Sequence, residues 1–379
     1  MSNKIITVAH VGDFLQYPPV ISLLENLLSN GNSVRLVSST LSGNLPRRIN
    51  KYDNFSYYYV PFSTDGSIQS KFKRFIKEKK DFKDAVVSAM KDSQILWTTT
   101  DVTMKILGDT VLDYKHVMQL MELVERYPSS LKLKIFDFPI EKYARKAYKV
   151  VVPDLDRAYI QQAWWNLKEV PIVLPNKPYS IYDEKVELNS EEVKALEKIK
   201  NEKRKVILYS GVITPERNIG DFAKAIRNRS EYCIYVMGRA FSRKYLDEFI
   251  NSNPNVEYLG YFAAPKHLSF VKYAYAGLTP YVPTNSNRYP KINALYCAPN
   301  KVYEYSAFGV PMLGTNVLGL LRPFEQYKIG KCSKDMTKES ILQGLDYIDS
   351  HHDEMSKNAI KFFNKDDLDE IVRDIIEDK

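Results

Sequence analysis

The sequence has few cysteines and no arrangement of residues that would hold a metal ion. Its three cysteines, Cys233, Cys297 and Cys332, lie far apart, and neither a CxxC pair nor a cluster of the five histidines occurs. Three scattered cysteines argue against a disulfide framework, and without a CxxC or His-rich spacing they argue against a zinc site. We therefore expect no metal site and no disulfide, and the cysteine usage indicates a reducing compartment.

Long apolar runs are also lacking. The sequence contains no stretch of about 18 apolar residues, the length that a membrane-spanning helix needs. The opening MSNKIITVAHVGDF has too short an apolar run for a secretion signal. Both observations predict a cytoplasmic protein.

The short motifs of several common enzyme classes are missing as well. No GxGxxG follows the first predicted strand, and GxxxxGK[ST], HExxH and GxSxG do not occur. A dinucleotide-dependent oxidoreductase and a P-loop NTPase thereby lose their main signals. The sequence consequently predicts no bound cofactor.

The composition is that of a folded, basic protein with two domains. The chain has 379 residues, 44% of them hydrophobic and 26% charged, which is enough for two sizeable cores. Its formal net charge of +8 favours an anionic partner, and nucleic acid, anionic lipid and sugar nucleotides all qualify. No nucleic-acid-binding motif accompanies the charge, so nucleic acid is the least supported of the three.

Strand-like and helix-like segments alternate in two series. The first opens with IITVAH, PPVISLLENLLSNG and SVRLVSS, and the second with KVILYSG at 205–211, after a proline-rich connector at 171–185. Such series predict an α/β protein with two Rossmann-like parallel-sheet domains facing a cleft. We expect an N-terminal domain at 1–175, a C-terminal domain at 176–355, and helices at 356–379 that pack back across the domains.

Ligands of open α/β sheets bind beyond the carboxyl ends of the strands, beside helix N-termini. This rule selects four turns, at residues 10–13, 210–212, 237–239 and 315–319. Arg217 falls at the predicted start of the helix after the second turn, where the helix dipole and a guanidinium together suit a diphosphate. The alternative is a plain helix start with a solvated arginine.

The segment NALYCAPNKVYEYSAFGVPMLGTN, residues 293–316, predicts a helix that starts near Pro299. Lys301 and Glu304 then lie on one face of this helix. The lysine can neutralise a phosphate, and the carboxylate can accept two hydrogen bonds from a ribose diol. The alternative is an ordinary surface ion pair, which contributes only about 0.2–0.5 kcal/mol.

The order YSGVITPERNI, YVMG, YLGYF and APNKVYEYSAFGVPMLGTN resembles the donor-binding domain of retaining GT-B glycosyltransferases of family 4, of the bacterial surface polysaccharide type. The resemblance is good over residues 205–330 and weaker over the N-terminal half. It implies that Arg217 binds the donor diphosphate, that Glu304 binds the ribose hydroxyls, and that the base lies near Tyr261. The full set of implied donor-binding residues is Gly211, Arg217, Gly238, Arg239, Tyr261, Phe262, Asn300, Lys301, Glu304, Leu318 and Gly319.

The sequence departs from the family pattern at two positions. The first glutamate of the Glu-x7-Glu motif is Tyr296, and the arginine that follows the strand-end glycine is Val212. These departures leave Arg217 and Lys301 to carry the positive charge. The implied catalytic residues are Arg217, Lys301 and Asp13.

The resemblance places acceptor binding in the N-terminal domain. Its candidate residues are Gly12, Asp13, Phe14, His116 and Glu122. A glycine after the first strand lets backbone approach a ligand closely. Asp13 either orients an acceptor hydroxyl or simply starts the helical region.

The resemblance implies a metal-independent glycosyltransferase. It would move a sugar from a UDP- or GDP-sugar to a glycan or undecaprenyl-diphosphate-linked acceptor, with retention, in capsule, exopolysaccharide or O-antigen assembly. The alternatives are a GT-B-like epimerase or phosphorylase, and a catalytically silent assembly scaffold.

A separate signal is the basic segment at 67–84. Its apolar residues recur at helical spacing, while lysines and Arg74 occupy the remaining face. This pattern suits peripheral contact with the anionic inner face of the cell membrane. The alternative is a core-packed helix with a solvated charged face.

Overall fold

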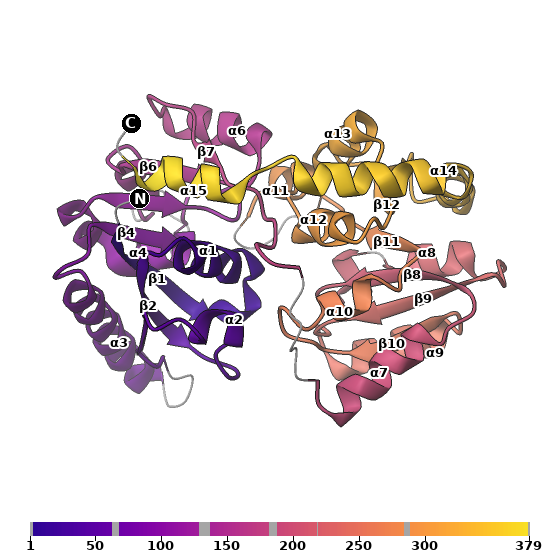
Figure 1. Ribbon diagram of the computed structural model, residues 1–379, viewed down its shortest axis with the longest axis horizontal. Helices are drawn as coiled ribbons and strands as arrows, with labels where there is room; N and C mark the ends of the chain where they lie inside the picture. Colours follow the sequence, from indigo (N-terminus) through magenta and orange to yellow (C-terminus); the bar gives the residue numbers. More distant parts are fainter. Residues whose placement is uncertain are drawn as a thin grey trace. The chain divides into compact units, whose positions relative to one another are not determined.

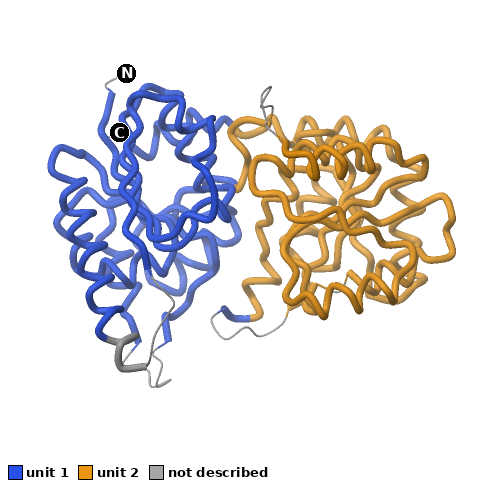
Figure 2. The backbone as a smooth tube through the Cα atoms, turned by 90° about the horizontal axis from the view of Figure 1, so that it is seen from below, with its two compact units in different colours: residues 1–175, 286–290, 367–379 blue, residues 176–285, 291–366 orange. Residues whose placement is uncertain are grey.

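The computed structural model describes residues 3–62, 68–128, 137–181, 188–217, 219–283 and 289–377. The chain forms two compact units, coloured separately in Figure 2. Unit 1 comprises residues 1–175, 286–290 and 367–379, and unit 2 comprises residues 176–285 and 291–366. Each unit contains a parallel β-sheet with helices on its faces (Figure 1).

The sheet of unit 1 has the strand order β3-β2-β1-β4-β5-β6-β7 in the described part of the chain. All of its neighbouring strands pair in parallel. The strands are β1 (Ile5–Asp13), β2 (Ser33–Thr40), β3 (Phe55–Tyr59), β4 (Ile95–Thr99), β5 (His116–Gln119), β6 (Lys149–Val152) and β7 (Ile172–Val173). The chain order reverses between β1 and β4, as in Rossmann-like sheets.

The helices of unit 1 bury the two faces of this sheet. They are α1 (Pro18–Ser29), α2 (Arg47–Asn50), α3 (Ile68–Ala89), α4 (Asp101–Leu107), α5 (Ile140–Ala144), α6 (Leu155–Trp165) and α15 (Leu368–Ile376), with 3-10 turns η1 (Phe14–Gln16) and η2 (Gly108–Asp113). Every residue of β4 is buried, as expected for a central strand covered on both faces. The prolines that open α1 suit a helix start, because the first amide groups of a helix need no intrahelical partner.

The sheet of unit 2 has the order β10-β9-β8-β11-β12-β13, again entirely parallel among the described residues. Its strands are β8 (Lys205–Ser210), β9 (Tyr232–Met237), β10 (Val256–Gly260), β11 (Ala276–Thr279), β12 (Met312–Thr315) and β13 (Gly330–Ser333). The reversal of chain order lies between β8 and β11. The predicted pair of Rossmann-like parallel-sheet domains is therefore confirmed.

The helices of unit 2 follow the strands in βα alternation. They are α7 (Ser190–Lys200), α8 (Ile219–Ile226), α9 (Arg243–Ser252), α10 (Leu268–Val271), α11 (Lys291–Leu295), α12 (Asn300–Ala307), α13 (Leu318–Tyr327) and α14 (Lys338–Asn364), with the 3-10 turn η4 (Pro215–Arg217). Helix α10 covers one turn only.

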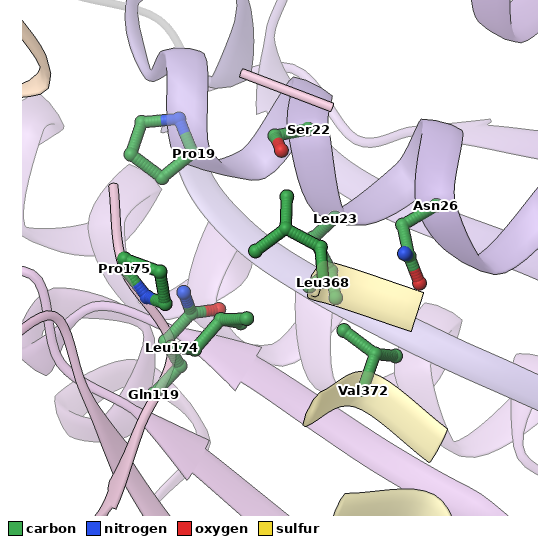
Figure 3. A pocket seen from close by; sticks show the side chains of 9 residues that line it. All are labelled: Pro19, Ser22, Leu23, Asn26, Gln119, Leu174, Pro175, Leu368 and Val372. Carbon is green, nitrogen blue, oxygen red and sulfur yellow. The ribbon is translucent and has the colours of Figure 1, made fainter. Parts of the chain in front are cut away.

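The last helix of the chain, α15, belongs to unit 1 and packs against α1 (Figure 1). Asn26 of α1 and Asn30, which caps the end of this helix, both donate to the Asp369 carboxylate, at 2.8 and 2.7 Å. Lys4 also donates to the carbonyl of Ile376 at 2.6 Å. A small cavity remains between α15, α1 and the end of β5, lined mainly by apolar side chains such as Leu23 and Leu368 (Figure 3).

The basic segment forms most of α3, which packs beside β2. Phe82 is completely buried and contacts Phe62, so the predicted apolar stripe is in part a core-facing one. Phe75 and Ile76 are exposed, at 45% and 53%. The side chains at 68–72 lie outside the described residues.

Candidate functional site

The candidate site lies at the carboxyl ends of the strands of unit 2, where the chain order reverses between β8 and β11. Open α/β sheets bind ligands at this position because the loops on either side of the reversal run in opposite directions. Gly211 directly follows β8, and Tyr281 follows β11 by two residues. The site residues described below lie around Gly211 and Tyr281.

Two glycines make close contacts in this region possible. Gly211 and Gly238 have φ angles of +149° and +138°, which side chains rarely adopt. A Cβ atom on Gly211 would lie 2.6 Å from the Nζ of Lys301, and one on Gly238 would lie 1.9 Å from the carbonyl oxygen of Gly211. The backbone of Gly211 thus leaves no room for a side chain at Gly238, and Gly211 itself lies against the side chain of Lys301.

Lys301 and Arg217 place two cationic groups beside this glycine turn. The Arg217 guanidinium lies 4.3 Å from the centre of the Tyr281 ring, and the Lys301 ammonium lies 5.9 Å from the same ring. Burial and the charge of Arg217 lower the pKa of Lys301 to about 8, against an opposing effect of Glu304. An anion bound at this point would relieve the repulsion between the two cations.

The lowered pKa of Lys301 predicts a pH-dependent affinity for diphosphates. The ammonium form is the major form of the unliganded protein only below about pH 8. Above that pH the ligand must also drive proton uptake, so the Kd of a nucleoside diphosphate should rise by up to about tenfold per pH unit. Titration calorimetry between about pH 7 and pH 9.5 measures this slope.

Lys301→Met provides the control, because it should bind the same ligand more weakly and with a flat profile over that range. An equally flat profile in the wild-type protein would contradict the placement of Lys301 at the anion.

The helix that carries Lys301 is fixed by its neighbours. Pro299 caps α12 in extended backbone conformation, and Gly309 ends it with a φ of +66°. The buried Tyr305 hydroxyl donates to the carbonyl of Leu208 at 2.8 Å and accepts from the amide of Ser210 at 3.2 Å. These bonds join α12 to the end of β8, so Lys301 is held against the glycine turn.

Glu304 lies on the same helix and is only 5% exposed. Its Oε1 lies 3.0 Å from Nε2 of His267. Burial by itself raises the pKa of Glu304, but the charge of and hydrogen bond from His267, together with the charge of Lys301, hold it below its ordinary value. The carboxylate is therefore ionised at neutral pH and is not a solvated surface group.

His267 is the site residue that sequence reasoning missed. It lies immediately before α10, far from Glu304 in the sequence, and no motif or periodicity connects the two. Its only sequence signal is its place a few residues after Tyr261–Phe262, the predicted base-binding turn. The pairing depends on how α10 packs against α12.

Arg239, Tyr261 and Phe262 follow the carboxyl ends of β9 and β10, at the same edge of the unit 2 sheet. The Arg239 guanidinium lies 4.5 Å from the centre of the exposed Tyr261 ring. Phe262 is buried and stacks on Phe270 at 4.1 Å, so its side chain belongs to the core and only its backbone could contact a base.

The last three predicted donor-binding residues lie at the N-termini of helices. Asn300 is the first residue of α12, and Leu318 and Gly319 are the first two of α13. Gly319 lies against the backbone of Cys297, because a Cβ there would be 2.1 Å from the Cys297 carbonyl oxygen. These positions bring two helix starts, with their positive dipole ends, into unit 2's candidate site.

The predicted acceptor-side residues near β1 have structural partners. The Gly12 amide donates to the Ser39 hydroxyl at 2.8 Å. The Asp13 carboxylate caps η1 and accepts from the Leu15 amide and from the Gln16 side chain, at 3.2 and 2.7 Å. These hydrogen bonds are the ones expected from the alternative interpretation, in which Asp13 starts the helical region. Phe14 is completely buried.

His116 and Glu122, the other acceptor-side candidates, lie at the start of β5 and three residues after its end. His116 is a core residue of β5, 2% exposed, with its Nε2 2.8 Å from the Thr98 hydroxyl. Burial lowers the pKa of His116 to about 3. Glu122 is half-buried, and its carboxylate lies 4.0 Å from the buried Arg157 guanidinium. The burial of His116 follows from its place at the start of a central strand.

No group of three or more histidine, cysteine, aspartate or glutamate side chains within the described residues could hold a metal ion. None of the described helices is long and apolar enough to cross a bilayer.

Comparison with solved structures identifies the architecture. The chain superposes on Anabaena Alr3699/HepE in complex with UDP-glucose with a TM-score of 0.70 and 12% identity, covering 98% of both chains. The glycosyltransferase from Rickettsia africae ESF-5 gives 0.65 and 13% over the whole of both chains. WaaG, a glycosyltransferase involved in lipopolysaccharide biosynthesis, gives 0.63 and 14% over 99% of this chain and all of that chain.

The chain has the GT-B fold. No protein-family model and no curated protein sequence matches it. At 11–14% identity, these likenesses concern the arrangement of the backbone. Assigning a function therefore depends on the residues of this chain.

Proposed function

We propose that the protein is a glycosyltransferase that uses a UDP- or GDP-sugar as donor. The observation that carries the proposal is the group formed by Arg217, Lys301 and the buried, ionised Glu304 around the glycine turn after β8. Structures of similar fold contain UDP or UDP-glucose, which supports the same class of ligand here.

The three side chains have distinct tasks in this proposal. Transfer breaks the bond between the anomeric carbon and the diphosphate oxygen, and forms a bond to the acceptor oxygen, whose proton is released. Negative charge develops on the departing diphosphate, and Arg217 and Lys301 stabilise it. Glu304 accepts hydrogen bonds from the ribose hydroxyls. Two cations in place of a divalent metal make the proposed reaction metal-independent.

The acceptor is assigned to unit 1, at the carboxyl ends of β1 and β4. Gly12 and Asp13 lie there, and the Asp13 carboxylate acts by holding the loop in place. We infer a glycan or undecaprenyl-diphosphate-linked glycan as acceptor, in assembly of a surface polysaccharide, with retention at the anomeric carbon. The resemblance of the PNKxxEY segment to that type of enzyme supports this assignment.

Helix α3 supports a peripheral contact with the cytoplasmic face of the membrane. Phe75 and Ile76 are exposed next to lysines of the same helix, as in helices that lie on anionic bilayers. A lipid-linked acceptor would be reached from such a position. The protein should sediment with vesicles that contain anionic lipid, and Phe75→Ser with Ile76→Ser should remain in solution.

Thermal unfolding with UDP, GDP and their sugars is the first test of the proposed function. A nucleotide present at about 100 times its Kd should stabilise the protein by about 2.7 kcal/mol, and the base that does so identifies the donor class. Product analysis follows with acceptor glycans. Free UDP or GDP with an extended acceptor supports transfer, whereas sugar isomers without an acceptor indicate an epimerase.

The scaffold alternative predicts a third result. A protein that binds the donor but transfers nothing to a broad panel of acceptors would be a catalytically silent assembly component. Absence of stabilisation by every nucleotide would contradict the donor site altogether.

A further inference from the structure

His267 and Glu304 form an isolated buried pair in unit 2. The side chains come from the start of α10 and from α12, and Nε2 lies 3.0 Å from Oε1. The residues are 9% and 5% exposed. Within the described residues, the carboxylate of Glu304 has no other hydrogen-bond partner. One carboxylate oxygen is thus occupied by the imidazole and the other is left for a ligand.

The chemistry of the pair fixes the direction of its hydrogen bond. An ionised carboxylate only accepts, so Nε2 of His267 must carry the proton that lies between them. The Nδ1 atom of His267 is buried and has no partner in the described part of the chain. The imidazole therefore makes its one polar contact with Glu304.

The other charged groups nearby would draw Glu304 elsewhere. Lys301 lies three positions earlier on α12, within the range at which opposite charges attract on a helix. Arg217 is close enough to Lys301 to lower the pKa of its ammonium group. Lys266, the neighbour of His267, is paired with Glu192 of α7 at 2.8 Å and so points to a different element. Without His267, the carboxylate would be free to turn toward Lys301.

We propose that His267 is a positioning residue that selects ribonucleotides. Its contact with Oε1 keeps the Glu304 carboxylate away from Lys301 and presents Oε2 to the ribose hydroxyls. The ammonium then stays available for phosphate. His267 also lies a few residues after Tyr261, so it links the turn assigned to the base with the carboxylate assigned to the ribose. The inference rests on the proposed function, because it concerns the nucleoside half of the same donor site.

Titration calorimetry of three ligands tests the role of His267. The ligands are the nucleoside diphosphate that stabilises the wild-type protein, its 2′-deoxy form and inorganic pyrophosphate. The wild-type protein should prefer the ribose form by tenfold or more, as expected for a hydrogen bond to a charged group. In His267→Ala this preference should fall by about tenfold, while the Kd of pyrophosphate changes less than about twofold.

Two further variants make the result specific. His267→Gln keeps an N–H donor and should restore part of the preference. His352→Ala is the matched control, since His352 bonds the Tyr275 carbonyl just before β11, at the opposite end of the strands. It should leave all three Kd values unchanged.

The outcomes separate the inference from the proposed function. An unchanged preference for ribose in His267→Ala overturns the positioning role and leaves nucleotide binding intact. An equal loss of affinity for pyrophosphate also overturns the positioning role, because the substitution would then weaken the whole site and not the ribose contact alone. A wild-type protein that binds pyrophosphate and no nucleotide contradicts the proposed function itself.

Discussion

Replacing Arg217 with alanine should lower kcat/KM for sugar transfer by about 10²–10³-fold, the usual cost of removing one group that stabilises developing charge. Arg217 lies at the end of η4 with its guanidinium over the Tyr281 ring. Its charge lowers the pKa of Lys301, so the two cations act on one region. In the Arg217→Ala variant, only Lys301 would remain to stabilise the departing diphosphate. Steady-state kinetics with the identified donor measures the loss.

Arg243→Ala is the control for this prediction. Arg243 belongs to unit 2 as well, but its side chain is 82% exposed and pairs only with Asp247 among the described residues. Both variants should unfold within about 1 kcal/mol of the wild type, because Arg217 is only partly buried and Arg243 is exposed. Wild-type turnover in Arg217→Ala would remove Arg217 from the donor site.

Replacing Gly238 with alanine should destabilise unit 2 by about 2–5 kcal/mol. The added Cβ would lie 1.9 Å from the Gly211 carbonyl oxygen, and the φ of +138° is strained for any side chain. To make room, Gly211 would have to move, and with it the turn against Lys301. Nucleotide binding should therefore be lost even below the unfolding temperature. Urea unfolding and calorimetry measure the two effects.

Gly220→Ala is a matched control in the same unit. Gly220 lies in α8 with no positive φ, and a Cβ there would meet Phe249 at an ordinary 3.9 Å. Alanine favours helices over glycine, so the free energy of unfolding should stay the same or rise by up to about 1 kcal/mol. A Gly238→Ala protein as stable as Gly220→Ala would contradict the close contact between the two glycine turns.

The parts of the structure that were predictable depend on neighbours in the sequence. Alternation of strands and helices is a local pattern, and the rule for parallel sheets converts it into two Rossmann-like sheets with known ligand edges. Helical spacing likewise places Lys301 and Glu304 on one face of α12. Gly211 and Arg217 follow one strand closely enough for their neighbourhood to be inferred.

The parts that were not predictable depend on packing between distant segments. His267 meets Glu304 only because α10 packs against α12. The burial of Phe262 depends on the position of Phe270. The burial of His116 at the start of β5 depends on the neighbouring strands β4 and β6. Neither hydrophobic period nor motif spacing contains this information.

The return of the chain to unit 1 through α15 has a consequence for biosynthesis. Asn26 of α1 and Asn30 at its C-cap both donate to the carboxylate of Asp369, more than 300 residues later in the sequence. Helix α1 therefore leaves the ribosome long before the segment that completes its packing. Unit 2 ends at Asp366, whose backbone carbonyl accepts a hydrogen bond from Lys177. During translation, the second unit can mature before the first, and a stalled chain would expose the uncovered side of α1 to chaperones.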